Sequence, residues 1–199
     1  LQQLPLLPKW GDNRTFAMTS ATACSLPPPP AYSEDTTSDF YKEAIEVYDT
    51  VKALTPEQKL IARFWSDDPM LSPTPPGHWL FIALDILKLK ESKLEDSVDL
   101  LARLGMGLSD AFVACWKSKF EYDLLRPVTY IKAHIDKTWE PLLITPPFPE
   151  YPSGHSTQSG AAAVILTQFF GENFAFEDKT HIREKFKGRP FKNFWEAAS

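Results

Sequence analysis

The chain has 199 residues, a formal net charge of −5 and 43% hydrophobic residues. A chain of this length and composition can fold as one domain with a substantial core. The acidic balance argues against a broad nucleic-acid surface, which needs basic excess, but it leaves room for a small positively charged pocket. The longest apolar run, residues 161–170, is far shorter than the ~20 residues of a membrane span. We therefore expect one domain, no nucleic-acid partner and no membrane span.

The first 37 residues are rich in proline, with four consecutive prolines at 27–30. Such a run favours polyproline II geometry and excludes helix. Large apolar side chains also recur along this segment, which is unusual for a free linker. We expect residues 1–37 to form an extended arm that lies over the body of the protein. The expected anchors are Leu6, Trp10, Phe16 and Met18.

Helix signals dominate residues 38–199. Ser38 can cap a first helix, and Thr55 and Gln58 form a capping box with a proline at the first helical position. No run shows the alternation that indicates a strand. The predicted class is all-α, a helical bundle over 38–199 with an extended proline-rich arm. The helices are expected at 39–54, 56–65, 77–89 (apolar on most sides and therefore central), 94–125 (ended by Pro127), from Ser153 to Gly171, and at 191–198.

The stretch Pro152-Ser-Gly-His155 marks the start of the helix that ends at Gly171. Ser153 is a good N-cap, and Gly154 leaves the backbone accessible to a ligand. The first N–H groups of a helix lack internal partners and carry partial positive charge, so they can bind an oxyanion. His155, in the first turn, can exchange a proton with such an anion. The alternative is an ordinary capping serine followed by an exposed histidine.

Two cations lie near the end of the preceding long helix. Lys119 and Arg126 are seven residues apart, which places them two turns apart on one helical face. Pro127 disfavours helical geometry at Arg126, so the guanidinium can turn away from the helix axis. Arginine presents a planar fork to an oxyanion and lysine a point charge. The alternative is a solvated last turn, where cations suit the helix dipole.

The combination of Lys119, Arg126-Pro127 and Pro152-Ser153-Gly154-His155 resembles the signature of a known superfamily. It is shared by vanadium-dependent haloperoxidases and type-2 phosphatidic acid phosphatases. The resemblance implies that Lys119, Arg126, Ser153 and Gly154 bind vanadate or phosphate, and that Lys119 and His155 are catalytic. It extends over nearly the whole chain and is greatest to the soluble bacterial haloperoxidase branch, as in the phrases WGDNRTFAM, PTPPGHW and FKNFWEAAS.

Two aromatic residues also match that branch. Trp116 stands three residues before Lys119, and Phe148 stands five residues before Ser153. In chloride-oxidising relatives such residues border the halide. The alternative is that both are ordinary core aromatics.

The third family motif, Ser-Arg followed after five residues by His, has no match in the chain. The resemblance implies that this motif supplies a second arginine and the apical histidine of vanadate. That histidine is expected beyond Ser199, so the chain is expected to be incomplete at its C-terminus and to hold no metal-ligating residue. His78, His134 and His181 do not replace that histidine; His78 and His134 are expected to be structural.

The resemblance implies an enzyme that oxidises halide with hydrogen peroxide and uses vanadate. Two alternatives remain open: a phosphatase that hydrolyses phosphomonoesters in the same pocket without a cofactor, and a catalytically incomplete oxyanion-binding or interaction domain. The partners are then halide and peroxide, or a phosphoester. A periplasmic or secreted location is favoured. Halide preference, oligomeric state and a disulfide between Cys24 and Cys115 stay open.

Overall fold

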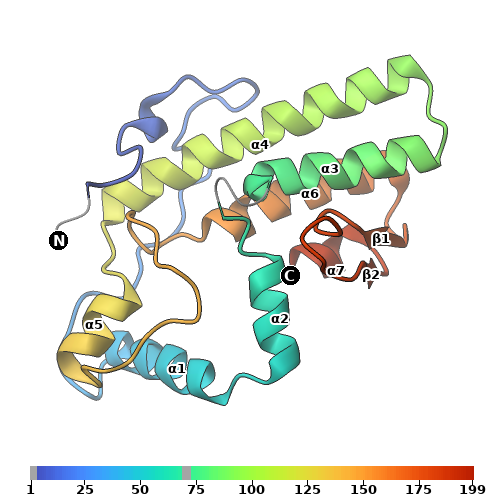
Figure 1. Ribbon diagram of the computed structural model, residues 1–199. Helices are drawn as coiled ribbons and strands as arrows, with labels where there is room; N and C mark the ends of the chain where they lie inside the picture. Colours follow the sequence, from blue (N-terminus) through green and yellow to red (C-terminus); the bar gives the residue numbers. More distant parts are fainter. Residues whose placement is uncertain (1–3, 69–72) are drawn as a thin grey trace.

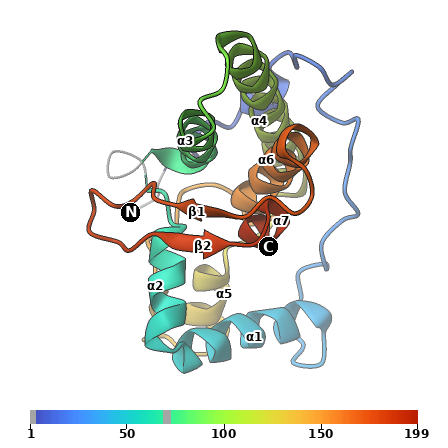
Figure 2. The same cartoon turned by 90° about the vertical axis from the view of Figure 1, so that its right-hand side faces the viewer.

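A computed structural model describes residues 4–68 and 73–199 of the chain. The described part is predominantly helical, as the sequence predicts, and a long helix, α4, spans its upper edge (Figure 1). Helices α3 and α6 run alongside α4, while α1, α2 and α5 lie below them (Figures 1 and 2). The elements are η1 Trp10–Asp12, α1 Asp39–Ala53, α2 Pro56–Phe64, α3 Thr74–Leu89, α4 Leu94–Tyr122, α5 Pro127–His134, α6 Gly154–Phe170, β1 Phe176–Asp178, β2 Arg189–Phe191 and α7 Phe194–Ala198.

The main core lies between α3, α4, α6 and α7. Leu100, Leu104 and Leu166 are fully buried there. Helices α4 and α6 approach closely at Gly107, where an added Cβ would lie 2.4 Å from Cδ1 of Ile165. The glycine that makes room for this approach belongs to α4. The packing fixes α6, and so its N-terminus, against α4.

A second apolar cluster joins α1 and α5. Phe40 and Ala44 of α1 pack with Tyr130 and Ile131 of α5, and Trp139 completes the cluster. The rings of Phe40 and Tyr130 meet edge to face at 4.9 Å. This cluster holds α5, which begins one residue after Arg126.

Helix starts follow the predicted caps. The Ser38 and Ser153 side chains accept hydrogen bonds from the backbone N–H of Tyr41 and Ser156, and the capping box at Thr55 is complete. The predicted end of the long helix is wrong. It ends at Tyr122, because Asp123 adopts a left-handed conformation (φ 47°).

Pro127 has a different role from the one the sequence predicts. It opens the short helix α5, where a proline at the first helical position loses no hydrogen bond. Arg126 is the N-cap of α5, with extended backbone. The restriction that proline places on the preceding residue is confirmed, but Arg126 does not share a helical face with Lys119.

Two further expectations need correction. The third helix contributes one face to the main core, but it is not central, because its apolar residues Phe81 and Leu84 are each 47% exposed. A two-stranded antiparallel sheet, β1 with β2, was also not expected. Each strand has three residues, which is too short to show an alternating pattern.

The arm contacts the body of the protein, and its anchors are chiefly polar. Phe16 is 62% exposed, whereas the backbone N–H groups of Phe16, Ala17 and Met18 donate to the buried Asp110 carboxylate at 2.7–2.8 Å. Trp10 packs edge to face on Phe112. Figure 2 shows the arm continuing along one side of the molecule to α1.

The end of the arm is held near α5. Tyr32 contacts Nε2 of His134 through its hydroxyl (3.2 Å), and Tyr130 donates to the Ser33 carbonyl oxygen. His134 therefore has a structural contact, in line with the expectation. Cys24 is exposed and Cys115 is buried, and both thiols are free.

Replacing Asp110 with Asn is expected to destabilise the fold by about 2 kcal/mol at neutral pH, since a buried carboxylate loses charge-assisted hydrogen bonds. Burial alone would raise the pKa of Asp110, but the three N–H donors outweigh it and hold the pKa below its ordinary value. The stabilisation is therefore present above the unfolded pKa of about 3.9 and is lost as pH falls through the lower native pKa. Urea unfolding of both proteins across pH measures this difference.

The matched control is Asp99→Asn, which removes the exposed partner of Arg103. It should cost well under 1 kcal/mol. Equal stability of Asp110→Asn and the parent protein at pH 7 would contradict the role given to Asp110.

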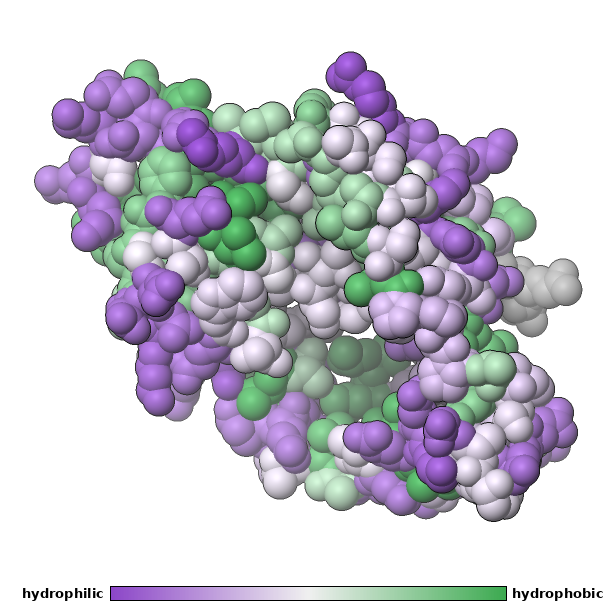
Figure 3. All heavy atoms as spheres, turned by 180° about the vertical axis from the view of Figure 1, so that it is seen from behind, coloured by the Kyte–Doolittle hydropathy of each residue, from purple (hydrophilic) through white to green (hydrophobic). Residues whose placement is uncertain are grey.

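None of the described helices has the length and apolar character needed to cross a membrane. Seen from behind, polar residues cover much of the surface, and a hollow with apolar residues on its floor opens between the upper and lower parts (Figure 3).

Candidate active site

Lys119, in the last turn of α4, is only 1% exposed. Its Nζ donates to the carbonyl oxygens of Pro149 (2.8 Å) and Glu150 (2.9 Å). An ammonium group has three N–H donors, so one remains for a further acceptor. Burial, with help from the charge of Arg126, lowers the pKa of Lys119 to about 8. A solvated last turn, the alternative for this residue, is wrong.

Arg126 is held by two contacts to the same segment as Lys119. Its Nε donates to the Phe148 carbonyl oxygen (2.6 Å), and Nη1 donates to the Glu150 carboxylate (2.5 Å). Nη2 is buried and has no hydrogen-bond partner among the described residues. A buried guanidinium nitrogen without an acceptor is costly, and an anion beside it would satisfy it. Glu150 is the acidic partner whose position the sequence did not reveal.

Two aromatic rings flank the cations. Trp116 and Phe148 lie 4.9 Å apart, and Nζ of Lys119 lies 5.0 Å from the Phe148 ring. The Arg126 guanidinium lies 4.6 Å from the same ring. Trp116 is 4% exposed, and its Nε1 donates to the Leu6 carbonyl oxygen of the arm. These rings limit the access of water to the two cations.

The start of α6 lies beside the same rings. A Cβ on Gly154 would lie 3.5 Å from the Trp116 ring, so the N-terminal turn of α6 is adjacent to the aromatic wall that Trp116 and Phe148 form. The Pro152 carbonyl oxygen accepts from Sγ of Cys115, which fixes the turn against α4. A cavity of about 990 Å³ adjoins Arg126 and Phe148, and its lining comes mainly from the end of α4, from α5 and from residues 140–149. The structure thus brings into one region Trp116, Lys119, Arg126, Phe148, Ser153 and Gly154.

His155 lies in the first turn of α6, as predicted, and the residue is exposed, which fits the alternative of an exposed histidine after a capping serine. Its imidazole interacts with the backbone of Trp65 and Ser66, and the charges of Asp67 and His78 affect its pKa. Desolvation of the ring, with a contribution from His78, lowers the pKa of His155, although the Asp67 charge and the backbone contacts oppose this shift. The immediate neighbours of His155 therefore differ from those of Lys119 and Arg126.

Those neighbours belong to a buried ionic cluster that the sequence did not predict. Nδ1 of His78 lies 2.9 Å from Asp67, and Nε2 lies 2.7 Å from Asp178. His181 also contacts Asp67, at 3.0 Å. Burial would lower the pKa of His78, but the two carboxylates raise it to about 9. The structural expectation for His78 fits these ion pairs, but its partners are too distant in sequence to be inferred.

The last residue, Ser199, contributes to the end of α7 rather than to this site. Its backbone N–H donates to the Trp195 carbonyl oxygen (3.1 Å), and its hydroxyl contacts the Glu196 carbonyl oxygen. The apical histidine of vanadate, expected beyond Ser199, therefore stays a prediction. The companion expectation, that the chain itself holds no metal-ligating residue, also stays a prediction, although Asp67, His78 and His181 lie close enough together to hold an ion. Their separation in sequence hides this grouping until the chain is folded.

Comparisons with known proteins converge on one family. A model of the VCPO second helical-bundle domain matches residues 99–137 and 133–193. The crystal structure of the first bacterial vanadium-dependent iodoperoxidase is 42% identical, with a TM-score of 0.93 over 98% of this chain. The chain belongs to the vanadium-dependent haloperoxidase superfamily. The vanadium chloroperoxidase of Curvularia inaequalis is 27% identical over an alignment of 141 residues, which covers 58% of this haloperoxidase-family chain.

A further structure, the apo form of a bacterial vanadium-dependent chloroperoxidase, is 17% identical with a TM-score of 0.71 over 98% of this chain, which shows the shared fold. The chain covers only part of each relative: 48% of the iodoperoxidase chain, 49% of the bacterial chloroperoxidase chain and 23% of the Curvularia enzyme. The resemblance inferred from Lys119, Arg126 and Ser153–His155 is confirmed at the level of the family.

Proposed function

We propose that the protein carrying this chain is a vanadate-dependent haloperoxidase, and that Lys119, Arg126 and the start of α6 bind its oxyanion. The observation that carries the proposal is the unpartnered, buried Nη2 of Arg126 near the buried ammonium of Lys119, as the described residues place them. Such donors in a water-poor site bind a small anion strongly. The family relationship supplies the chemical class of the anion.

The residues present fit vanadate. Lys119 and Arg126 offer donors and positive charge, and the N–H groups at the start of α6 add partial positive charge nearby. The carboxylate of Glu150 in their region is already paired with Arg126. When bound, vanadate would activate hydrogen peroxide for the oxidation of halide.

The chain's own residues would bind and orient the reactants. Arg126 would donate a hydrogen bond to the anion from Nη2, while Nε and Nη1 keep their bonds to the Phe148 carbonyl oxygen and the Glu150 carboxylate. Lys119 would direct its third N–H toward the same anion, and its positive charge would stabilise negative charge that develops there. His155 would hold or release a proton. Along the aromatic wall, Trp116 and Phe148 would exclude water beside the halide.

Iodide is the proposed halide. The 42% identical relative is described as an iodoperoxidase and matches 98% of this chain. The phosphatase alternative would use the same cations, so the contacts of Lys119 and Arg126 do not separate the two activities. The aromatic wall and the family relationship favour the haloperoxidase.

The test uses the full-length protein loaded with orthovanadate and supplied with hydrogen peroxide and iodide, bromide or chloride in separate reactions. We expect oxidation of iodide that is lost when phosphate replaces vanadate. Absence of halide oxidation, together with vanadate-inhibited phosphate release from a phosphomonoester, would establish the phosphatase instead. Absence of both activities, with vanadate still bound, would support an oxyanion-binding domain.

A further inference from the structure

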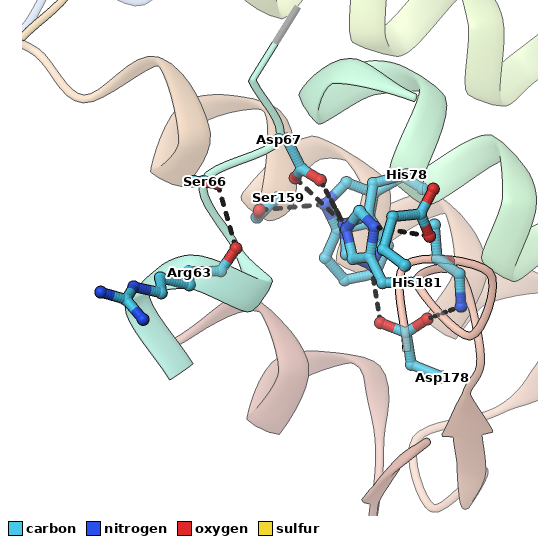
Figure 4. Close-up of polar contacts among 10 residues, drawn as sticks. Arg63, Ser66, Asp67, His78, Ser159, Asp178 and His181 are labelled. Atoms are coloured by element: carbon cyan, nitrogen blue, oxygen red, sulfur yellow. Dashed lines mark hydrogen bonds and ion pairs between the residues drawn. The ribbon is translucent and has the colours of Figure 1, made fainter. Parts of the chain in front are cut away.

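A cluster of three buried side chains has the composition of a metal site. Asp67, His78 and His181 are 2%, 0% and 3% exposed, and they come from the segment after α2, from α3 and from the segment after β1. Figure 4 shows these side chains converging. One ligand atom from each lies within 4.8 Å of the others.

The separations suit a small divalent ion. The nitrogens Nδ1 of His78 and Nε2 of His181 lie 2.9 and 3.0 Å from Oδ1 of Asp67. Around a tetrahedral zinc ion with bonds of about 2.0–2.1 Å, neighbouring ligand atoms are roughly 3.3 Å apart. A small outward shift of each ligand would therefore admit the ion. Asp67 also adopts a left-handed backbone conformation (φ 49°), an unfavourable geometry that the fold retains at this point.

His78 has the outer carboxylate partner that is typical of a metal ligand. The second nitrogen of His78, Nε2, lies 2.7 Å from Oδ2 of Asp178. Asp178 is itself fixed by the backbone N–H of Thr180. The carboxylate nearest the second nitrogen of His181 is that of Glu184, at 3.8 Å, which is too far for a hydrogen bond, so the outer partner is established for His78. A carboxylate behind a ligating histidine orients the ring and strengthens it as a ligand.

The buried carboxylates of the cluster depend on the histidines for compensation. Asp67 and Asp178 place two carboxylates in a region with almost no solvent. Buried carboxylates need compensation. His78 and His181 provide this compensation through direct contacts, and a divalent ion held between Asp67 and the two histidines would provide it as well.

We propose that Asp67, His78 and His181 bind one divalent transition-metal ion of the zinc type, with Asp178 orienting His78. The site is closed by protein, so the ion fastens α3 to the segments after α2 and β1. Lys119 and Arg126 contribute no ligand to it, whereas His155 lies near Asp67 and His78.

The test uses full-length protein with any affinity tag removed, stripped of metal by a chelator and kept free of vanadate. Titration with zinc chloride should show one ion per chain and a raised melting temperature. Anomalous scattering at the zinc edge should place the ion between Asp67, His78 and His181. Failure to bind zinc, or scattering only at surface positions, would overturn the proposal and leave a purely ionic cluster.

Two variants and a control sharpen the result. His181→Gln should abolish stoichiometric zinc binding, and Asp178→Asn should weaken it by about 10- to 100-fold through the loss of the outer carboxylate. His134→Gln, which changes a histidine that contacts Tyr32 outside the cluster, should bind as the parent does. If His181→Gln does not fold, the zinc content and the anomalous scattering of the parent protein still show whether the cluster binds zinc. Since no vanadate is present, the outcome is independent of the oxyanion site.

Discussion

Replacing Lys119 with Met is expected to weaken orthovanadate binding by about 10- to 100-fold, the usual cost of a charge-assisted hydrogen bond. Turnover of the loaded enzyme should fall by about 100-fold or more. The reason is that Lys119 is 1% exposed and keeps one N–H beyond its bonds to Pro149 and Glu150. Methionine retains the apolar stem, so the change removes chiefly the charge and its donors. Calorimetric titration of the full-length protein measures the affinity.

The matched control is Lys117→Met on the same helix, since Lys117 is partly exposed and pairs with Asp12 of the arm. It should leave vanadate affinity unchanged. A pH series with sulfate, whose charge is constant, separates binding from structure. Burial lowers the pKa of Lys119 to about 8, so sulfate binding should weaken as pH rises through 8 in the parent protein. A parent affinity that is flat across this range, or an unaltered affinity in Lys119→Met, would refute the assigned role.

Replacing Arg126 with Lys should also lower vanadate affinity by at least about 10-fold, although the formal charge is kept. The guanidinium is aimed by two of its nitrogens, Nε on the Phe148 carbonyl oxygen and Nη1 on the Glu150 carboxylate. Only a planar fork can keep both contacts and still present Nη2. A lysine at this position would pair with Glu150 and would have no donor in the place of Nη2 for the anion. The same titration measures the loss.

Arg103→Lys is the control for this change, because Arg103 is exposed on α4 and pairs with Asp99. It should behave as the parent protein does. Parent-like affinity in Arg126→Lys would mean that charge alone suffices and that the unpartnered Nη2 has no role.

The sequence predicts best those features that depend on neighbouring residues. Ser38, Thr55 and Ser153 cap their helices because capping joins groups only three residues apart. The family motif could likewise be read locally, and the structure holds Lys119 and Arg126 on one segment, residues 148–150. The prediction that Lys119 and Arg126 share one helical face was wrong, however. The left-handed residue after Tyr122 ends α4 early, and Arg126 is the N-cap of α5.

Features that depend on distant contacts were not predictable. The Asp67 and His181 side chains meet across 114 positions of sequence, and no periodic pattern relates them. For that reason the sequence did not reveal this buried cluster. Asp110 lies within an apolar helical repeat, where a carboxylate suggests a solvated position, yet it receives three N–H groups from the arm. In both cases the partners are backbone or polar groups that only the folded chain brings together.

The proposed oxyanion site depends on one tetrahedral anion that contacts both Lys119 of α4 and Arg126, the N-cap of α5. A crystal structure of the full-length protein with vanadate, or with tungstate as a heavier analogue, tests it most directly. We expect one anion within hydrogen-bond distance of both Nζ of Lys119 and Nη2 of Arg126, beside Ser153 and Gly154 at the start of α6. An anion bound elsewhere, with Lys119 still contacting only its two carbonyl groups, would contradict the account.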